Sequence, residues 1–225
     1  MLKIKSIKNK TFLGIFAHPD DDAFGLSGTL IKLNQNNNQI YEIFITSGDA
    51  GTNQLTGKKE KNLGEKREKE ALAAGKIFNI KKIWFLRYKD GSLSNNLYHQ
   101  VAEKIEKIIK KIKPDFLLTY EWRGVSGHID HIFTSMVTSF LAQKYHLTVF
   151  YYARIKINKK RPPYFIFFPP GYNKKDLDLI VDVSDVFDKK INAMKCHQTQ
   201  IEDAKRIIEF YKDLPKEEGF FIKKF

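Results

Sequence analysis

The sequence is short of cysteine and of long hydrophobic stretches. Cys196 is the single cysteine among 225 residues, so no internal disulfide can form, and this usage suits a reducing compartment. The first apolar run ends at His18 after about six residues, which is too short for a signal peptide. No stretch approaches the roughly 20 apolar residues that cross a bilayer. The sequence therefore predicts a soluble, cytoplasmic protein without a membrane span.

Acidic residues are under-represented relative to basic ones. The chain has 39 Lys and Arg against 26 Asp and Glu, which gives a formal net charge of +13. The excess is mostly Lys dispersed along the chain, as on a solvated surface, whereas nucleic-acid-binding proteins gather basic residues in a patch or stripe. Nucleic acid is therefore not expected as a partner. A non-catalytic basic module that binds nucleic acid or an anionic polymer is kept as the third of three function classes.

Internal repeats, low-complexity blocks and long linkers are also lacking, so a single domain over residues 1–225 is expected. Short apolar runs alternate with amphipathic segments of helix length. Strands are expected at residues 12–17, 40–46, 82–86, 115–120, 147–153 and 178–183. Helices are expected at residues 23–35, 63–78, 97–112 and 130–145, after Ser184, and over 201–214. The last ten residues fit either a final strand or a partner-binding tail.

This alternation predicts an α/β, Rossmann-like fold with a mainly parallel sheet flanked by helices. In such sheets ligands bind beyond the carboxyl ends of the strands. Polar clusters follow four of the expected strands, at residues 18–22, 46–51, 87–91 and 121–131. We therefore expect these four loops to meet at one rim of the sheet.

Two of these loops combine histidine with carboxylates. The first, "IFAHPDDDAFG" (15–25), places His18 before three consecutive acids, and the fourth, "SGHIDHIFTS" (126–135), places two histidines around Asp130. Catalytic zinc sites keep three protein ligands and leave the fourth position to water. Histidine and carboxylate also suit Fe²⁺ or Mn²⁺. The two loops therefore predict a divalent metal site, although the residues alone do not separate Asp20 from Asp21 as the ligand.

Each of these residues also has a structural interpretation. A single loop histidine is most often a surface or hydrogen-bonded residue, and Asp22 is placed to cap the helix that follows it. The histidines are nevertheless concentrated, because three of the six lie in just these two loops: His18, His128 and His131. This concentration favours the metal site. His99 and His146 lie within or beside expected helices, where a structural role is expected.

The two loops resemble the signatures of the PIG-L/LmbE-like family of zinc-dependent N-acetylglucosaminyl deacetylases. The family has Ala-His-Pro-Asp-Asp-Glu in the first loop and His-Pro-Asp-His in the fourth, where this chain has "AHPDDD" and "GHIDH". Asp22 therefore replaces a glutamate and Ile129 replaces a proline. Neither position is a ligand or a base in the family.

Weaker family features follow in the same order over most of the chain. They are "TSGDAGT" (46–52), Arg67 with Glu70 and Ala74, "LRYKDG" (86–91) with Arg87 in place of the usual glycine, and "KCHQTQ" (195–200). The resemblance implies the LmbE-like version of the expected fold. It also implies a hydrolase that removes the acetyl group from an N-acetylated amino sugar or its conjugate.

The resemblance also implies roles for individual residues. His18, Asp21 and His131 correspond to the metal ligands, with Zn²⁺ as the expected ion and Fe²⁺ or another divalent metal as the alternative. Asp20 corresponds to the general base that takes a proton from water. His128 corresponds to the residue that stabilises the oxyanion or protonates the departing amine, and Asp130 to the carboxylate that orients its ring.

Substrate contacts are implied for Arg67, Asp90 and His197, since a planar donor and a charged acceptor suit sugar hydroxyls. The alternative for Arg67 is an ion pair with Glu70 one helical turn away, and for Asp90 it is an Asp-Gly turn. Cys196, beside His197, is expected to be a small packing residue, because nothing nearby marks it as activated.

Residues 156–176 break the strand and helix alternation. This segment holds both double prolines, several aromatic residues and a concentration of Lys and Arg. We interpret it as an aromatic and basic insertion at the rim, which acts as a substrate lid or pocket wall; the alternative is a β-hairpin packed into the core.

Three function classes follow from these observations. The first is metal-dependent deacetylation of a small-molecule N-acetylated sugar. The second is a metallohydrolase of another amide on the same scaffold, since one fold hosts many chemistries. The third is the basic binding module already described. A homo-oligomer is compatible with each class, and no residue identifies the particular sugar.

Overall fold

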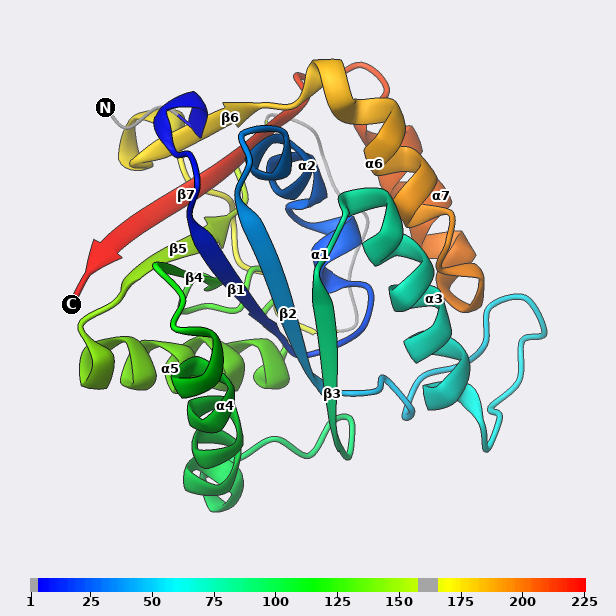
Figure 1. The fold of residues 1–225 in the computed structure, drawn as a ribbon. Coiled ribbons are helices and arrows are strands. Elements are labelled where there is room, and N and C mark those ends of the chain that lie inside the picture. Colours follow the sequence, from blue (N-terminus) through cyan, green and yellow to red (C-terminus); the bar gives the residue numbers. More distant parts are fainter. Residues whose placement is uncertain (1–3, 158–165) are drawn as a thin grey trace.

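The computed structural model describes residues 4–157 and 166–225, and Figure 1 shows a mixed sheet with helices on both faces. The strands are β1 (Thr11–Phe16), β2 (Gln39–Thr46), β3 (Lys82–Tyr88), β4 (Phe116–Tyr120), β5 (Thr148–Ala153), β6 (Leu179–Asp182) and β7 (Glu217–Lys224). The helices are α1 (Asp21–Phe24), α2 (Ser27–Gln35), α3 (Leu63–Phe78), α4 (Tyr98–Ile112), α5 (Ile129–Tyr145), α6 (Phe187–Met194) and α7 (Ile201–Tyr211). Short 3₁₀ turns lie at Ile4–Ser6, Asn95–Leu97, Lys174–Asp176, Ser184–Val186 and Gln198–Gln200.

The strand order is β3-β2-β1-β4-β5-β7-β6. All pairs from β3 to β5 are parallel, and β7 runs antiparallel to both β5 and β6. This arrangement confirms the Rossmann-like, mainly parallel sheet that the sequence predicts. The chain moves outward from β1 in one direction through β2 and β3, and in the other through β4 and β5. Ligands of such sheets bind where the order reverses, which here lies between β1 and β4.

Helices cover both faces of the sheet. Phe12 and Phe16 of β1 pack on the side of α2, α3 and α6, whereas Leu13 and Ile15 pack on the side of α4 and α5 (Figure 1). Because β1 is buried on both faces, its sequence is an almost continuous apolar run. Among the described residues, none of the helices combines the length and apolarity of a membrane-spanning segment.

The helix expected over residues 23–35 is divided into α1 and α2. A buried ion pair occupies the break: Lys190 Nζ lies 2.6 Å from Glu218 Oε1, and the two side chains are 4% and 3% exposed. Glu218 accepts the N–H of Gly28 at 3.1 Å, and Lys190 donates to the carbonyl of Gly25 at 2.6 Å. Polar groups of the broken helix are thus satisfied by α6 and β7. This contribution comes from residues far away in the sequence.

The last ten residues were expected to form either a strand or a tail. They form β7, which is inserted between β5 and β6, and Phe220 is fully buried. β7 therefore pairs with a strand on each side, as Figure 1 shows.

Candidate active site

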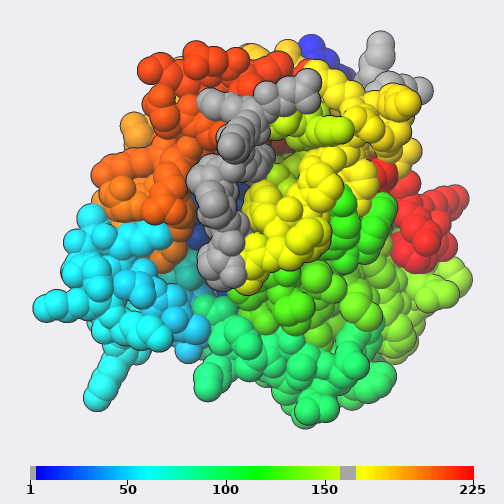
Figure 2. Space-filling view, turned by 180° about the vertical axis from the view of Figure 1, so that it is seen from behind, coloured from blue at the N-terminus to red at the C-terminus, as the bar shows by residue number. Residues whose placement is uncertain are grey.

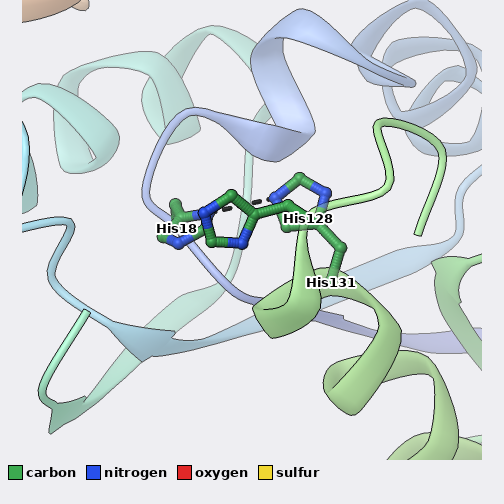
Figure 3. Close-up of side chains that lie close together, drawn as sticks. All are labelled: His18, His128 and His131. Carbon is green, nitrogen blue, oxygen red and sulfur yellow. Dashed lines mark hydrogen bonds between the residues drawn. The ribbon is translucent and has the colours of Figure 1, made fainter. Parts of the chain in front are cut away.

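The site lies at the carboxyl edge of the sheet, between β1 and β4. His18 follows β1, His128 is the N-cap residue of α5, and His131 lies in the first turn of that helix. Figure 3 shows the three imidazoles grouped together, although they come from two separate loops. One ring nitrogen from each lies within 4.8 Å of the other two. The switch point of the sheet therefore brings together the two loops that carry the predicted metal site.

The rings of His18 and His131 face each other in an unusual way. His18 Nδ1 and His131 Nε2 are 3.0 Å apart. The other nitrogen of each ring faces an acceptor: His18 Nε2 lies 2.9 Å from Asp90 Oδ1, and His131 Nδ1 lies 3.0 Å from the carbonyl of Gly124. If those nitrogens carry the protons of neutral rings, the two facing nitrogens both present lone pairs. A divalent ion, or a proton shared between the two nitrogens, would satisfy this arrangement.

Asp21 supplies the third group. Its Oδ1 lies 3.2 Å from His131 Nε2, and its Oδ2 lies 3.6 Å from His18 Nδ1. Ligand atoms around a tetrahedral zinc ion are about 3.3 Å apart when each bond is about 2.0–2.1 Å long. The three separations are close to this value, but the two carboxylate distances involve different oxygens, and Oδ2 also accepts the backbone N–H of His18 at 2.6 Å. His18, Asp21 and His131 fit the group that the sequence predicts.

A second set of groups surrounds the other side of His18. Besides Asp90, Asp130 Oδ2 lies 3.5 Å from His18 Nε2, and these three residues also bring ligand atoms within 4.8 Å of one another. The Asp130 carboxylate, however, accepts the backbone N–H groups of Gly91 at 2.8 Å and Leu93 at 3.2 Å. Both carboxylate oxygens of Asp130 thus hold the loop that carries Asp90. We interpret this set as the outer layer that fixes the ring of His18.

The carboxylates around His18 favour a positive charge at the centre of the site. Burial alone would lower the pKa of His18, but hydrogen bonds to Asp130, Asp21 and Asp90 outweigh it and raise the pKa well above its usual value. Burial alone would raise the pKa of Asp21, but the charges and hydrogen bonds of His131 and His18 hold it well below the usual range. The site is therefore built to keep a carboxylate ionised beside a cation.

Asp20 forms an ion pair with a buried arginine. Arg67 Nη2 lies 2.8 Å from Asp20 Oδ1, and Arg67 is only 5% exposed. Its Nη1 donates to the carbonyl of Gly48 at 2.9 Å. Gly48 has a φ of +65°, and a Cβ there would lie 2.2 Å from Arg67 Nη1, so only glycine fits. The predicted alternative of an Arg67 pair with Glu70 is not what orders Arg67, because Glu70 accepts from Thr199 N and Oγ1.

His128 is held by the start of its own helix. Its Nδ1 accepts the backbone N–H of Asp130 at 3.2 Å, which caps α5. The carboxylate of Asp130, which was expected to orient this ring, instead binds Gly91 and Leu93. Burial lowers the pKa of His128, and the nearby His18 and His131 lower it further. A neutral ring whose Nδ1 accepts a hydrogen bond carries its proton on Nε2.

The predicted substrate residues are buried beside this site. Both oxygens of Asp90 are engaged, one by His18 and one by the N–H of Ala50 at 3.2 Å, and the contacts with His18 lower the pKa of Asp90 to about 2 although burial opposes this. His197 is fully buried, and neither ring nitrogen has a hydrogen-bond partner among the described residues. Burial lowers the pKa of His197 to about 4. The charge of Asp20 acts to raise the pKa of His197 and that of Arg67 acts to lower it, but burial is the larger effect.

The expectation that Asp22 caps a helix is wrong. Asp22 lies inside α1 with no exposed surface, and within residues 4–157 and 166–225 its carboxylate has no hydrogen-bond partner. Glu42 of β2 is likewise fully buried and unpaired in that part of the chain. Burial raises the pKa of each group well above its usual value, and each is raised further by neighbouring carboxylates. The two acids are therefore buried close enough together for the charge of Asp22 to raise the pKa of Glu42.

Sequence reasoning missed Tyr120 and Glu121, which end and follow β4. The ring of Tyr120 stacks on His131, with centroids 4.3 Å apart and planes at 7°. Glu121 is 1% exposed and accepts from the N–H groups of Arg123 and Val125, which shapes the loop before His128. An aromatic residue at the end of a buried strand looks the same as a core residue in sequence. No periodicity distinguishes it.

The proposed rim insertion is described only in part, because residues 158–165 lie outside the described residues. Arg123 donates to the carbonyl of Pro170 at 3.0 Å, Arg154 donates to that of Pro169, and the Tyr172 hydroxyl donates to Glu121 at 3.0 Å. Figure 2 shows this yellow part of the chain lying against the green part. The described half of the insertion is thus bound to the loop that leads to His128.

The chain matches the model of a known protein family. The model, described as "PIG-L: GlcNAc-PI de-N-acetylase", matches residues 13–141. This range includes both histidine loops, Arg67 and Asp90. His197 and the segment around residues 156–176 lie beyond the match.

Curated relatives with similar sequences are deacetylases. The chain is 29% identical over 206 residues to the diacetylchitobiose deacetylase of Thermococcus kodakarensis, covering 90% of this chain and 74% of the relative. It is 27% identical over 206 residues to a probable N-acetyl-alpha-D-glucosaminyl L-malate deacetylase 2 of Bacillus subtilis, covering 88% and 86%. The fold is similar to that of N,N'-diacetylchitobiose deacetylase from Pyrococcus horikoshii, with a TM-score of 0.69, 24% identity, and coverage of 96% and 84%.

Proposed function

Because this chain belongs to the PIG-L family, we propose that it is a metal-dependent hydrolase that removes the acetyl group from an N-acetylated amino sugar or its conjugate. One observation carries the proposal: two imidazole nitrogens and a carboxylate converge, and a second carboxylate, Asp20, lies in the same loop as the first. The similarity to deacetylases of diacetylchitobiose and of a GlcNAc-malate conjugate supports an acetylated glucosamine as the sugar.

We propose that His18 Nδ1, His131 Nε2 and the Asp21 carboxylate hold one divalent ion, with Zn²⁺ as the expected metal. Histidine and carboxylate ligands also accept Fe²⁺, so the identity of the ion is part of the proposal. When bound, such an ion lowers the pKa of water and polarises the carbonyl of the acetyl group. The protein's own contribution is to fix both imidazole tautomers through Asp90 and the Gly124 carbonyl.

Asp20 acts as the general base in this scheme. It is adjacent to the proposed ligand Asp21, and its ion pair with Arg67 orients it. An ionised carboxylate at this place can take the proton from the attacking water. The same proton can then pass to the departing amine. Arg67 is thereby assigned an additional role as the group that holds the base.

His128 donates a hydrogen bond to the oxyanion of the tetrahedral intermediate. Because its Nδ1 accepts the N–H of Asp130, the proton of the neutral ring is on Nε2, the atom left to face the substrate. Asp130 contributes indirectly, since its backbone orients His128 while its carboxylate holds the Asp90 loop against His18. Donation from a neutral imidazole is therefore favoured over protonation of the amine by an imidazolium.

We assign the sugar contacts to Arg67, Asp90 and His197. Arg67 Nε and both nitrogens of His197 are buried without a hydrogen-bond partner among the described residues. Unpaired buried polar atoms are costly, and these groups would meet substrate oxygens only where the site opens, because His197 is fully buried. The rim segment at residues 156–176 is proposed as the wall that covers the sugar, since its described half is fastened to the loop before His128. A cytoplasmic location is also proposed, on the basis of the single cysteine.

The test is an amine-release assay on zinc-loaded protein with a panel of N-acetylated substrates. N-acetylglucosamine, diacetylchitobiose and a GlcNAc conjugate form one arm, and N-acetylated amino acids form the other. Release of amine and acetate from the sugar arm, abolished by a chelator, is the expected result. Turnover confined to the amino acids would establish the second class, a metallohydrolase of another amide. No turnover in either arm, together with salt-sensitive RNA binding, would support the basic binding module.

A further inference from the structure

Tyr120 contacts the segments that carry all three proposed ligands. It is the last residue of β4 and is 3% exposed, so its position is fixed by the sheet. Its ring lies flat against the imidazole of His131, with centroids 4.3 Å apart and planes at 7°. Its hydroxyl accepts the N–H of Ala17, the residue before His18, at 3.3 Å. Burial raises the pKa of the Tyr120 phenol well above its usual value, and the nearby charge of Asp21 raises it further.

These contacts are chemically consistent with one another. A phenol oxygen can accept one hydrogen bond and donate another, so the hydroxyl that receives the N–H of Ala17 keeps its own proton, with the charge of Asp21 nearby. His131 and His18 are 113 positions apart in the sequence, and they lie on two separate loops. One rigid side chain therefore links the loop after β1 to the first turn of α5.

His131 is constrained in two directions. Within its plane, Nδ1 is held by the carbonyl of Gly124 at 3.0 Å and lies 3.3 Å from Ser126 Oγ. Perpendicular to its plane, the ring rests on Tyr120. The first contact sets the tautomer, and the second sets the tilt of the ring. Both are needed for Nε2 to point toward His18 Nδ1 and Asp21.

We infer that Tyr120 is a positioning residue of the metal site, which sets the geometry of His131 relative to the loop after β1 that carries His18 and Asp21. The inference rests on the metal site of the proposed function, but it does not depend on the substrate. Groups that orient metal ligands typically contribute 10- to 100-fold to metal affinity when they are removed. The hydroxyl and the ring face of Tyr120 act on different ligands, so their contributions are separable.

The experiment compares three variants by zinc affinity, measured by competition with a chromophoric chelator. Tyr120→Phe keeps the stack on His131 and removes the hydroxyl, whereas Tyr120→Leu removes both. Tyr151→Phe is the matched control, since Tyr151 of β5 is also buried and its hydroxyl bonds Ser139 Oγ at 2.7 Å. The absorption spectrum of the Co²⁺-loaded proteins reports coordination geometry independently of affinity. Unfolding of the metal-free proteins confirms that each variant is folded.

We expect Tyr120→Phe to bind zinc about tenfold more weakly than the wild type and Tyr120→Leu to bind it still more weakly, by up to about 100-fold. Both variants should also alter the Co²⁺ spectrum. Tyr151→Phe should change neither the zinc affinity nor the spectrum. If Tyr120→Phe retains zinc affinity within twofold and an unchanged spectrum, the inference is wrong while the proposed function stands. If the wild type itself binds no zinc, both fail. If Tyr151→Phe weakens zinc as much as Tyr120→Phe, a general packing effect replaces the positioning role.

Discussion

The guanidinium of Arg67 is paired at 2.8 Å with the carboxylate of Asp20, the acid next to the proposed ligand Asp21. The contact joins the middle of α3 to the loop after β1. It separates the two neighbouring acids into different roles, because Asp21 faces the imidazoles while Asp20 faces a cation of the protein. Sequence alone could not make this distinction between two adjacent aspartates.

The Arg67–Asp20 pair predicts that substitution of either residue lowers kcat while zinc stays bound. Asp20→Asn removes the base, and kcat should fall by about 10²–10⁴, with zinc content unchanged. Arg67→Met leaves Asp20 without its cationic partner, so kcat should also fall, again without loss of metal. Steady-state kinetics with metal analysis of the same samples checks both. Loss of zinc from Asp20→Asn would mean that Asp20 is a ligand and that the assignment of the two acids is reversed.

His128→Ala should lower kcat by about 10²–10³, the usual effect of removing an oxyanion donor. KM and zinc content should change little, because His128 acts on charge that develops only in the intermediate. His128→Gln is the informative companion, since its amide can donate a hydrogen bond without titrating, and it should recover part of the rate. Full turnover in His128→Ala would remove this residue from the mechanism.

The contribution of Glu42 to the free energy of unfolding should decrease as pH rises. Burial raises the pKa of Glu42 well above its usual value, and the charge of Asp22 raises it further. The folded protein then keeps the proton at a pH where the unfolded chain has lost it, above about 4.3. The stabilisation is therefore complete below that pH and is lost progressively up to the raised pKa of the folded state. Glu42→Gln cannot ionise, so its Tm relative to wild type should increase between pH 5 and pH 8.

The control for Glu42 is an exposed glutamate on α7, Glu209, whose side chain is 76% exposed. Glu209→Gln should give a Tm difference that is nearly independent of pH. Thermal unfolding of the three proteins in metal-free buffer at several pH values provides the comparison. A Tm difference for Glu42→Gln that stays flat or shrinks as pH rises would show that Glu42 is not held protonated.

The buried pair of Lys190 and Glu218 should be costly to break. Lys190→Met leaves the carboxylate of Glu218 buried without its cation, which typically costs about 3–5 kcal/mol of unfolding free energy. The surface pair of Lys205 and Glu202 has side chains that are 64% and 48% exposed, and Lys205→Met should change stability by less than about 1 kcal/mol. Urea unfolding of both variants tests this. Equal, small effects would show that the break between α1 and α2 does not depend on the ion pair.

The elements predicted from sequence are those with strong local patterns. The helix at residues 63–78 has the same bounds as α3, and the strand at residues 40–46 differs from β2 by one residue at its start. The division between α1 and α2 could not be predicted, because its cause is an ion pair supplied by α6 and β7. The insertion of β7 between β5 and β6 is equally non-local. Periodicity reports which face of a strand is buried, and it says nothing of which strands are neighbours.

For the site, sequence patterns identified the histidine loops and the residues around them, and the fold explains their convergence at the switch between β1 and β4. What sequence could not supply is the partner of each polar atom. Asp130 shows this: its spacing from His128 suggested a carboxylate–imidazole pair, whereas its backbone N–H contacts that ring and its carboxylate holds the loop of Asp90. Tyr120 is a second example, since only the folded structure reveals that its ring stacks on His131.

The most direct test of the account is the zinc stoichiometry of the wild type and of single variants of His18, Asp21 and His131. Each variant replaces the ligand with alanine, and His99→Ala, on α4, is the matched control. Equilibrium dialysis followed by elemental analysis should find one tightly bound ion per chain in the wild type and the control, and almost none in the three ligand variants. Full zinc occupancy in any two of those variants would contradict the metal site on which the whole account rests.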